Sequence, residues 1–289
     1  MPGLNYFKDQ EDTRDYKFKL KKFLGKKPSR REQLLKAVEY CDYRSLMSSV
    51  KNQGNLGSCV GFAVTALKEY HENVEFIKEN FDPKNMSSEE MNALKTEFLE
   101  RKYDLSEQWT YWNAKKIDPW GPDVEGTSIR YALKVLHKIG CPPEKGWEYT
   151  DSAINIGEPE SWTHLIARWN TIESYWRLNS LSDILDALSI SGPVLIGVGC
   201  YEEIFRPEPD GFVPYPRYPQ YCYGGHALLL TGYDKKNSRV FFKNSWGENW
   251  GDGGYGSFGF DYMRDFCWDA WATKDHSVVR DMLRGSVSL

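Results

Sequence analysis

Apolar positions in the first half of the chain recur with the period of an α-helix. The clearest stripe consists of Ala63, Leu67, Tyr70, Val74 and Ile77. It predicts a long helix that follows a turn at residues 54–58, with Ser58 as its N-cap. Residues 87–102 begin with the Ser-x-x-Glu spacing of a capping box and predict a second helix. Residues 105–116 and 128–138 predict two more helices.

The second half of the chain is dominated by short apolar runs with the length of β-strands. The predicted strands cover residues 171–178, 193–199, 227–233, 239–246 and 254–260. A short helix is predicted at residues 181–190, and residues 43–53 are predicted to be extended. Helices followed by strands indicate an α+β protein with two lobes, and the cleft between the lobes is the expected place for a site.

Composition narrows the class of protein. Aromatic residues make up 15% of the 289 residues, which excludes disorder as the overall state. No apolar run approaches the roughly 20 residues that span a bilayer, and the first residues lack the apolar core of a signal peptide. A formal charge of −4 gives no electrostatic reason to expect nucleic acid. We therefore expect a soluble protein, in the cytoplasm or at an unknown location, with neither a nucleic-acid nor a membrane partner.

Charge is distributed unevenly along the chain. Residues 1–40 hold eleven Lys and Arg against six Asp and Glu, a net charge of +5, which leaves −9 for residues 41–289. This asymmetry predicts that a basic N-terminal extension, residues 1–40, docks on the acidic body. Three interpretations stay open: the extension restrains the cleft, it straps the back of the fold, or it is a loosely ordered terminus.

Three stretches carry residues suited to nucleophilic catalysis. Cys59 is predicted in the first turn of a helix, where free N–H groups and the helix dipole favour a thiolate. His226 opens a buried strand after two glycines, and Asn244 precedes a stretch rich in Trp and Gly. Each has an ordinary structural explanation when taken alone, because free cysteines and histidines often serve only packing. Together they occur in the chain order Cys, His, Asn.

These stretches resemble the motifs of papain-like cysteine peptidases, in particular bacterial, archaeal and viral members. Residues 53–63 match the nucleophile motif, residues 224–227 the histidine motif, and residues 244–255 the asparagine motif. The resemblance implies a two-lobe papain-like fold, with a helical lobe at residues 41–165 and an antiparallel β-barrel-like lobe at residues 166–289. It also makes residues 1–40 either a short pro-region or a strap.

The same resemblance implies roles for individual residues. Cys59 would be the nucleophile, His226 the general acid and base, Asn244 the residue that orients the histidine, and Gln53 an oxyanion-hole donor. The resemblance also implies five positions that would contact substrate: Gly57, Gly126, Gly225, Ala227 and Trp246. The implied activity is hydrolysis of peptide bonds in a peptide or protein substrate, as an endopeptidase, with no metal or organic cofactor.

Departures from the family pattern concern the cysteines. Leu56 stands where most relatives have a cysteine that forms a disulfide, and Val60 stands where a tryptophan usually follows the nucleophile. The five remaining cysteines have no partner assigned by the family. Because five is an odd number, they cannot all form disulfides within the chain, which favours a reducing compartment. Two alternatives stay open: an exopeptidase, transpeptidase or other acyltransferase with the same residues, and a non-catalytic binding module on the same fold.

Overall fold

The computed structural model describes residues 2–18, 38–82, 84–100, 103–217 and 220–275. The α-helices are α3 (Cys59–Asn80), α4 (Ser88–Glu100), α5 (Glu107–Lys115), α6 (Ile129–Lys138), α7 (Thr163–Ala167), α8 (Leu181–Ser191), α9 (Glu202–Phe205) and α10 (Phe260–Phe266). The strands are β1 (Tyr40–Asp42), β2 (Ser174–Leu178), β3 (Val194–Cys200), β4 (Phe212–Val213), β5 (Gly224–Asp234), β6 (Arg239–Lys243), β7 (Tyr255–Gly259) and β8 (Cys267–Lys274). Short 3-10 turns lie at Arg44–Leu46, Glu144–Gly146 and Arg168–Asn170.

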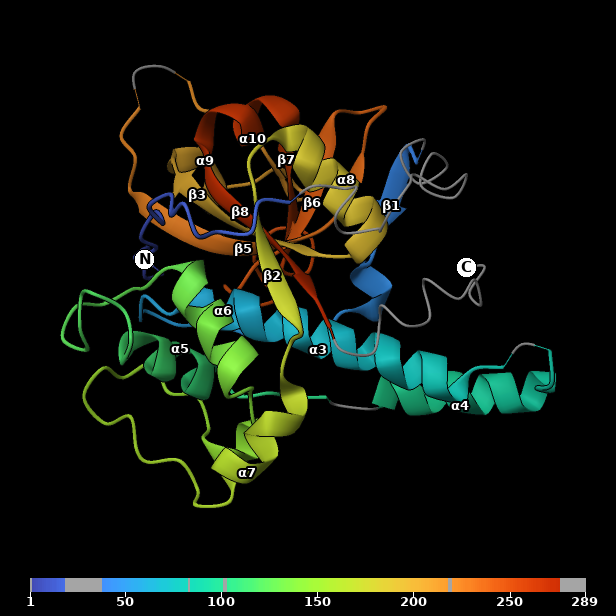
Figure 1. Cartoon of the computed structure of the whole chain (residues 1–289). Coiled ribbons are helices and arrows are strands. Elements are labelled where there is room, and N and C mark those ends of the chain that lie inside the picture. The colour runs from blue at the N-terminus through green and yellow to red at the C-terminus, as the bar shows by residue number, and fades with distance from the viewer. Residues whose placement is uncertain (1, 19–37, 83, 101–102, 218–219, 276–289) are drawn as a thin grey trace.

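The strands form one mixed sheet beside the helices, as expected for an α+β fold with two lobes. Its order is β2-β8-β3-β5-β6-β7-β4, with β1 added to β5, and among the described strands the sheet does not close on itself. All neighbours are antiparallel except β4 and β7. Figure 1 shows α3 crossing the middle of the molecule, with α5, α6 and α7 on one side of it and the sheet, with α8 and α10, on the other.

Alternation along the central strands divides the core in two. In β5, Ala227 and Leu229 belong to the core shared with α3, α5 and α6, whereas Leu228 and Leu230 belong to the core under α8 and α10. Successive side chains of a strand point to opposite faces, so a strand covered on both faces is apolar at nearly every position. The sheet is thus the wall against which the helical lobe packs.

Most predicted elements are present, with shifted ends. The capping box is formed: Glu90 N donates to Ser87 Oγ at 3.2 Å, and Ser87 N donates to Glu90 Oε2 at 2.7 Å. The expectation that residues 43–53 are extended is wrong at its start, because a 3-10 turn occupies Arg44–Leu46. The pattern of apolar residues also gave no prediction of α10 and β8, because their polar and aromatic residues interrupt the apolar periodicity.

Within the described ranges, no helix combines the length and apolar character needed to cross a bilayer.

Candidate active site

Cys59 is the first residue of α3. Gly54 has a φ of +62°, which allows the tight turn that delivers the chain to the helix. Ser58 holds the predicted N-cap position but makes no capping hydrogen bond; its Oγ lies 2.6 Å from the hydroxyl of Tyr149. The helix therefore starts without a side-chain cap beside the thiol, and its positive end is directed at Cys59.

Burial dominates the chemistry of that thiol in this state. The exposed fraction of Cys59 is 0%, and burial raises its pKa to about 11. The backbone N–H of Ala227 points at Cys59 Sγ from 3.4 Å and acts in the opposite direction. At neutral pH the residue is therefore a thiol rather than a thiolate.

His226, Asn244 and Trp246 meet on the sheet side of the site. His226 Nε2 lies 2.8 Å from Asn244 Oδ1, and the Trp246 ring stacks on the imidazole with a centroid distance of 4.6 Å. Both His226 and Asn244 are buried, and burial lowers the pKa of His226 to about 4. His226 Nδ1 is enclosed without a hydrogen-bond partner in the described part of the chain. One ring nitrogen is therefore held by Asn244, and the other has no described hydrogen-bond partner in this enclosed state.

Gln53 forms hydrogen bonds both to the loop before Cys59 and to Ser245, the residue after Asn244. Its Oε1 accepts a hydrogen bond from Ser245 Oγ at 2.6 Å, which fixes the amide so that Nε2 faces the nucleophile loop. Nε2 donates to the carbonyl oxygen of Leu56 at 2.9 Å and to that of Gly3 at 3.1 Å. A backbone carbonyl of the N-terminal segment, here residues 2–18, is thus bound by this amide.

The N-terminal segment lies across the residues expected to bind substrate. Tyr6 N donates to the carbonyl of Gly225 at 2.9 Å, and the segment pairs in parallel with Gly225 and Thr127. A Cβ on Gly57 would lie 2.6 Å from Asn5 Cβ, and one on Gly126 would lie 1.7 Å from the Asn5 carbonyl oxygen. In Figure 1 the blue start of the chain lies where α6 approaches the sheet. The interpretation of a strap on the back of the fold does not hold for residues 3–9.

Acidic side chains of the segment, not basic ones, anchor it. Asp9 pairs with Arg130 at 2.6 Å and with Arg177 at 3.3 Å, and Asp15 also pairs with Arg130. All four side chains are less than a tenth exposed. The predicted attraction between a basic extension and an acidic body is therefore reversed in sign for residues 2–18. The most basic stretch, residues 19–37, lies outside the described residues.

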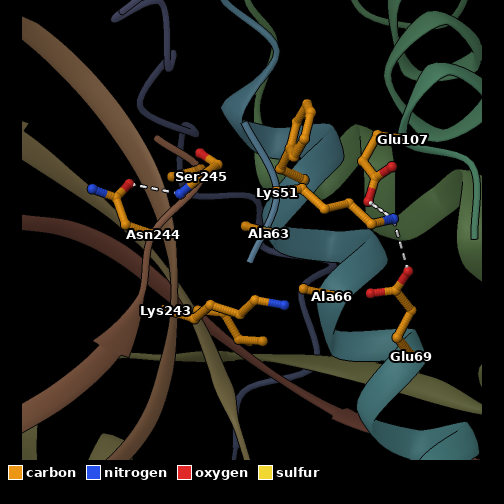
Figure 2. Close-up of a pocket in the computed structure, with 11 residues that line it drawn as sticks. Lys51, Ala63, Ala66, Glu69, Glu107, Lys243, Asn244 and Ser245 are labelled. Carbon is orange, nitrogen blue, oxygen red and sulfur yellow. Dashed lines mark hydrogen bonds and ion pairs between the residues drawn. The ribbon is translucent and has the colours of Figure 1, made fainter. Parts of the chain in front are cut away.

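A small cavity lined by both charged and apolar side chains lies behind the site, between α3 and the sheet. It has a volume of about 20 Å³, room for one water molecule. Figure 2 shows Lys51 reaching between two acids on one side and Lys243 entering from the sheet on the other. Lys51 Nζ lies 3.0 Å from Glu69 Oε1 and 2.7 Å from Glu107 Oε1. Lys243 Nζ donates to Ser48 Oγ, which in turn donates to Glu69. Because Lys243 immediately precedes Asn244, these bonds link the position of Asn244 to α3.

Burial and charge oppose each other in this cluster. Burial lowers the pKa of Lys243 to about 8, and it raises the pKa of Glu107 to about 8. Lys243 Nζ donates to the carbonyls of Ser48 and Ser49, both at 2.9 Å. These contacts satisfy an ammonium that would otherwise be costly to bury.

The predicted residues thus lie around one site: Gln53, Gly57, Cys59, Gly126, Gly225, His226, Ala227, Asn244 and Trp246. The fold does not join Cys59 to His226 by a hydrogen bond in the described part of the chain; the bond at Cys59 comes from Ala227. Sequence reasoning missed Gly3 and Tyr6, and it gave Ser245 no role of its own. Their contacts join segments far apart in the chain, and no local pattern indicates them.

Comparison with known proteins agrees with this geometry. The sequence profile of the papain family cysteine proteases matches residues 36–265. The chain therefore belongs to the papain family of cysteine proteases.

Individual relatives are distant. An uncharacterized peptidase C1-like protein of Acanthamoeba polyphaga mimivirus is 23% identical over 74% of this chain and 65% of its own length. A viral cathepsin of Spodoptera litura multicapsid nucleopolyhedrovirus is 26% identical over 75% of this chain and 56% of its own. The chain thus spans between about half and two thirds of the length of these two relatives. Among solved structures, xylellain, a cysteine protease from Xylella fastidiosa, superposes with a TM-score of 0.72 at 24% identity, covering 95% of this chain and 96% of its own.

Proposed function

We propose that the chain is a cysteine peptidase that hydrolyses peptide bonds through a thioester acyl-enzyme. The observation that carries the proposal is that Cys59, at the start of α3, accepts the backbone N–H of Ala227, the residue that follows His226 of the His226–Asn244 pair. A helix start supplies the field that favours a thiolate, and a histidine held through one nitrogen supplies a proton carrier.

The reaction follows from these groups. The Cys59 sulfur attacks the peptide carbonyl carbon, so that a C–S bond forms and an oxyanion develops. The Gln53 amide, fixed by Ser245, donates to that oxyanion. The C–N bond then breaks while the His226 imidazolium gives its proton to the leaving amine. Water, deprotonated by His226, finally hydrolyses the thioester and restores the thiol.

Water access decides the charge state of the pair. With the N-terminal segment in place, burial favours a neutral thiol and a neutral imidazole. Displacement of the segment would admit water, lower the pKa of Cys59 and raise that of His226. The charged thiolate–imidazolium pair is then the state of the opened site, and the covered site is inactive.

We further propose that residues 3–9 restrain the peptidase as a built-in inhibitor. The carbonyl of Gly3 takes the Gln53 amide that a substrate carbonyl would need. The Gly3 end of the segment lies at the Gln53 side chain, and from there the chain runs away from Gln53, past Gly225 and Thr127. The acyl half of a substrate bound at the same residues would run in the opposite direction, toward Cys59. The segment therefore occupies the site with its chain direction reversed relative to a substrate, and for this reason it resists cleavage.

The test uses the full chain with Gly3→Leu and Tyr6→Ala together, called here the opened variant. A Cβ at Gly3 would lie 2.6 Å from the Gly57 backbone nitrogen, so a leucine side chain does not fit and the segment cannot keep its docked position. An irreversible epoxysuccinyl inhibitor should label Cys59 in the opened variant at least ten times faster than in the unmodified chain. Thr13→Ala, an exposed change on the same segment, is the matched control. Equal labelling rates for the opened variant and for Thr13→Ala would reject the inhibitory role.

The exopeptidase and acyltransferase alternatives share the first half of this reaction. Product analysis of the opened variant with a long peptide and an added amine separates them. Internal cleavage products support an endopeptidase, whereas release of terminal residues or transfer to the amine supports an alternative.

A further inference from the structure

The loop between α5 and α6 returns to α5 at Gly126, and both backbone groups of Gly126 are bound there. Gly126 N donates to the Tyr111 hydroxyl at 3.0 Å, and Lys115 Nζ donates to the Gly126 carbonyl oxygen at 2.8 Å. Tyr111 and Lys115 are four residues apart, so they project from one face of α5. All six cysteines are free, so this loop is held by side chains of a helix and not by a disulfide.

The ammonium that holds Gly126 is completely buried. The side chains of Lys115 and Asp118 are both 0% exposed, and Lys115 Nζ lies 2.8 Å from Asp118 Oδ2. Asp118 Oδ1 in turn accepts hydrogen bonds from Trp120 N at 3.1 Å and from Gly121 N at 3.0 Å. A buried cation needs such partners, because an unpaired one is costly. The ion pair therefore fixes both the start of the loop and its end at Gly126.

The consequence for the cleft is that Thr127, and not Gly126, presents a backbone acceptor. The Thr127 carbonyl oxygen accepts the N–H of Phe7 at 3.1 Å. Gly126 contributes the absence of a side chain, since a Cβ there would lie 1.7 Å from the Asn5 carbonyl oxygen. A carbonyl acceptor pairs with an N–H of an added extended chain whether that chain runs parallel or antiparallel. The position of the Thr127 carbonyl, set through Gly126, thus decides how well an added backbone pairs.

We propose that Lys115 and Tyr111 are positioning residues of the cleft. By holding both backbone groups of Gly126, they place the Thr127 carbonyl where an extended chain pairs with it, first the N-terminal segment and, once that is displaced, a peptide substrate. They act through Gly126 and not on the reacting atoms. For the substrate the inference rests on the proposed peptidase function, whereas for the docked segment it stands without it.

The first experiment is hydrogen exchange of the full chain, which needs no turnover. Lys115→Met combined with Asp118→Asn, called here the unpaired variant, removes both charges of the buried pair, so that no lone charge is left inside. Its asparagine oxygen can still accept from the backbone of the loop. The protection factor of the Phe7 amide, measured by NMR, should fall at least tenfold, because its acceptor is no longer held in place. Lys116→Met, the same substitution at the exposed next residue, is the matched control.

Protection in β5 distinguishes positioning from a general loss of stability. The amides of residues 228–230 should change less than twofold in the unpaired variant. Protection of Phe7 equal to that in Lys116→Met would overturn the inference. A fall in β5 as large as the fall at Phe7 would also overturn it, since it would show that the buried pair serves stability alone.

The second experiment measures hydrolysis by the opened variant that also carries the two substitutions of the unpaired variant. KM for a peptide substrate should rise at least tenfold while kcat changes less than threefold, because bound substrate and transition state lose the same backbone pairing. Tyr111→Phe, which removes only the acceptor of Gly126 N, should act in the same direction. Iodoacetamide, which has no peptide backbone, should alkylate Cys59 at an unchanged rate.

The outcomes separate this inference from the peptidase function. An unchanged KM, or a kcat that falls as far as KM rises, would overturn the positioning role for substrate while leaving the hydrolysis in place. An opened variant that hydrolyses nothing would reject the peptidase function, and the exchange of Phe7 would then decide the inference by itself.

Discussion

At the scale of single residues, the thiol and the imidazole are both held neutral by burial. The pKa of Cys59 is raised to about 11 and that of His226 is lowered to about 4. Neither shift comes from the chemistry of a cysteine or histidine alone; both depend on what covers the site. The sequence indicated these two residues and Asn244 through local motifs, but their charge state depends on burial, which only the folded chain produces.

This dependence predicts a shift in the pH profile of Cys59 alkylation. In the unmodified chain, the iodoacetamide rate should stay low at neutral pH and rise only as pH approaches the raised pKa of the thiol. In the opened variant the rise should occur at lower pH, because water stabilises the thiolate. The rates are followed by mass spectrometry over the pH range in which both proteins stay folded. Superimposable profiles would contradict the account.

The hydroxyl of Tyr6 should contribute to keeping the site covered. Tyr6→Phe in the otherwise unmodified chain removes only the donor to Asp269, and a hydrogen bond to a charged group contributes about 1.5–3 kcal/mol. Alkylation of Cys59 at fixed pH should therefore become roughly ten to a hundred times faster. Tyr221→Phe, at a tyrosine with an exposed fraction of 76%, is the matched control. A rate no higher than that of the control would show that the hydroxyl does not hold the segment.

At the scale of elements, local signals predicted helices and strands equally well, and they missed α7, α9 and α10 as well as β1, β4 and β8 among the described elements. The capping box at Ser87 and the stripe of α3 depend on neighbours three or four residues apart, so sequence alone specifies them. β8 escaped prediction, since Asp269 and its flanking tryptophans interrupt the apolar run. It is nevertheless an interior strand, paired with β2 and β3, and its Asp269 accepts the hydroxyl of Tyr6. A buried carboxyl that accepts a hydrogen bond from a distant segment breaks the simple pattern of a buried strand.

The charge cluster between α3, α5 and the sheet should contribute strongly to stability. Lys51→Met leaves the carboxylate of Glu69 buried without its cation and removes a donor to Glu107; the two acidic side chains are 0% and 2% exposed. Removing one partner of a buried pair typically costs about 3–5 kcal/mol of unfolding free energy. Urea unfolding followed by fluorescence measures the change. Arg264→Met, which removes an exposed pair with Asp265, should leave the midpoint unchanged. Similar midpoints for both variants would contradict the role given to the cluster.

At the scale of the whole molecule, the charge split of the sequence predicted a contact but not its chemistry. The described part of the extension docks through Asp9 and Asp15 on Arg130 and Arg177, the reverse of the expected polarity. Net charge sums over segments, whereas docking depends on which side chains become buried together. The family motifs predicted the two-lobe papain fold correctly. The boundaries at residues 40 and 165 stay predictions.

The docked segment should respond to pH through Asp9. Burial raises the pKa of Asp9 to about 6, against the lowering effect of Arg130 and Arg177, while Asp269 acts in the same direction as burial. In a displaced segment the carboxyl returns to its ordinary value of 3.8. Docking therefore takes up a proton: it is favoured at low pH and weakens as pH rises through about 6, by up to roughly a hundredfold.

Hydrogen exchange of residues 3–9 measures this effect. The protection factor, corrected for the intrinsic pH dependence of exchange, should fall between about pH 4 and pH 6 and level off above. Asp9→Asn, which cannot take up the proton, should flatten the curve over that interval. Protection that instead rises with pH in the unmodified chain would contradict the sign of the linkage.

The most direct test of the central claim is covalent labelling combined with hydrolysis in one protein. The opened variant, with and without Cys59→Ala, is treated with an epoxysuccinyl inhibitor and assayed on dipeptidyl fluorogenic substrates. The account predicts a single labelled residue, Cys59, and hydrolysis that disappears when Cys59 is replaced. A folded opened variant that is neither labelled nor active, or a Cys59→Ala form that hydrolyses equally well, would contradict it.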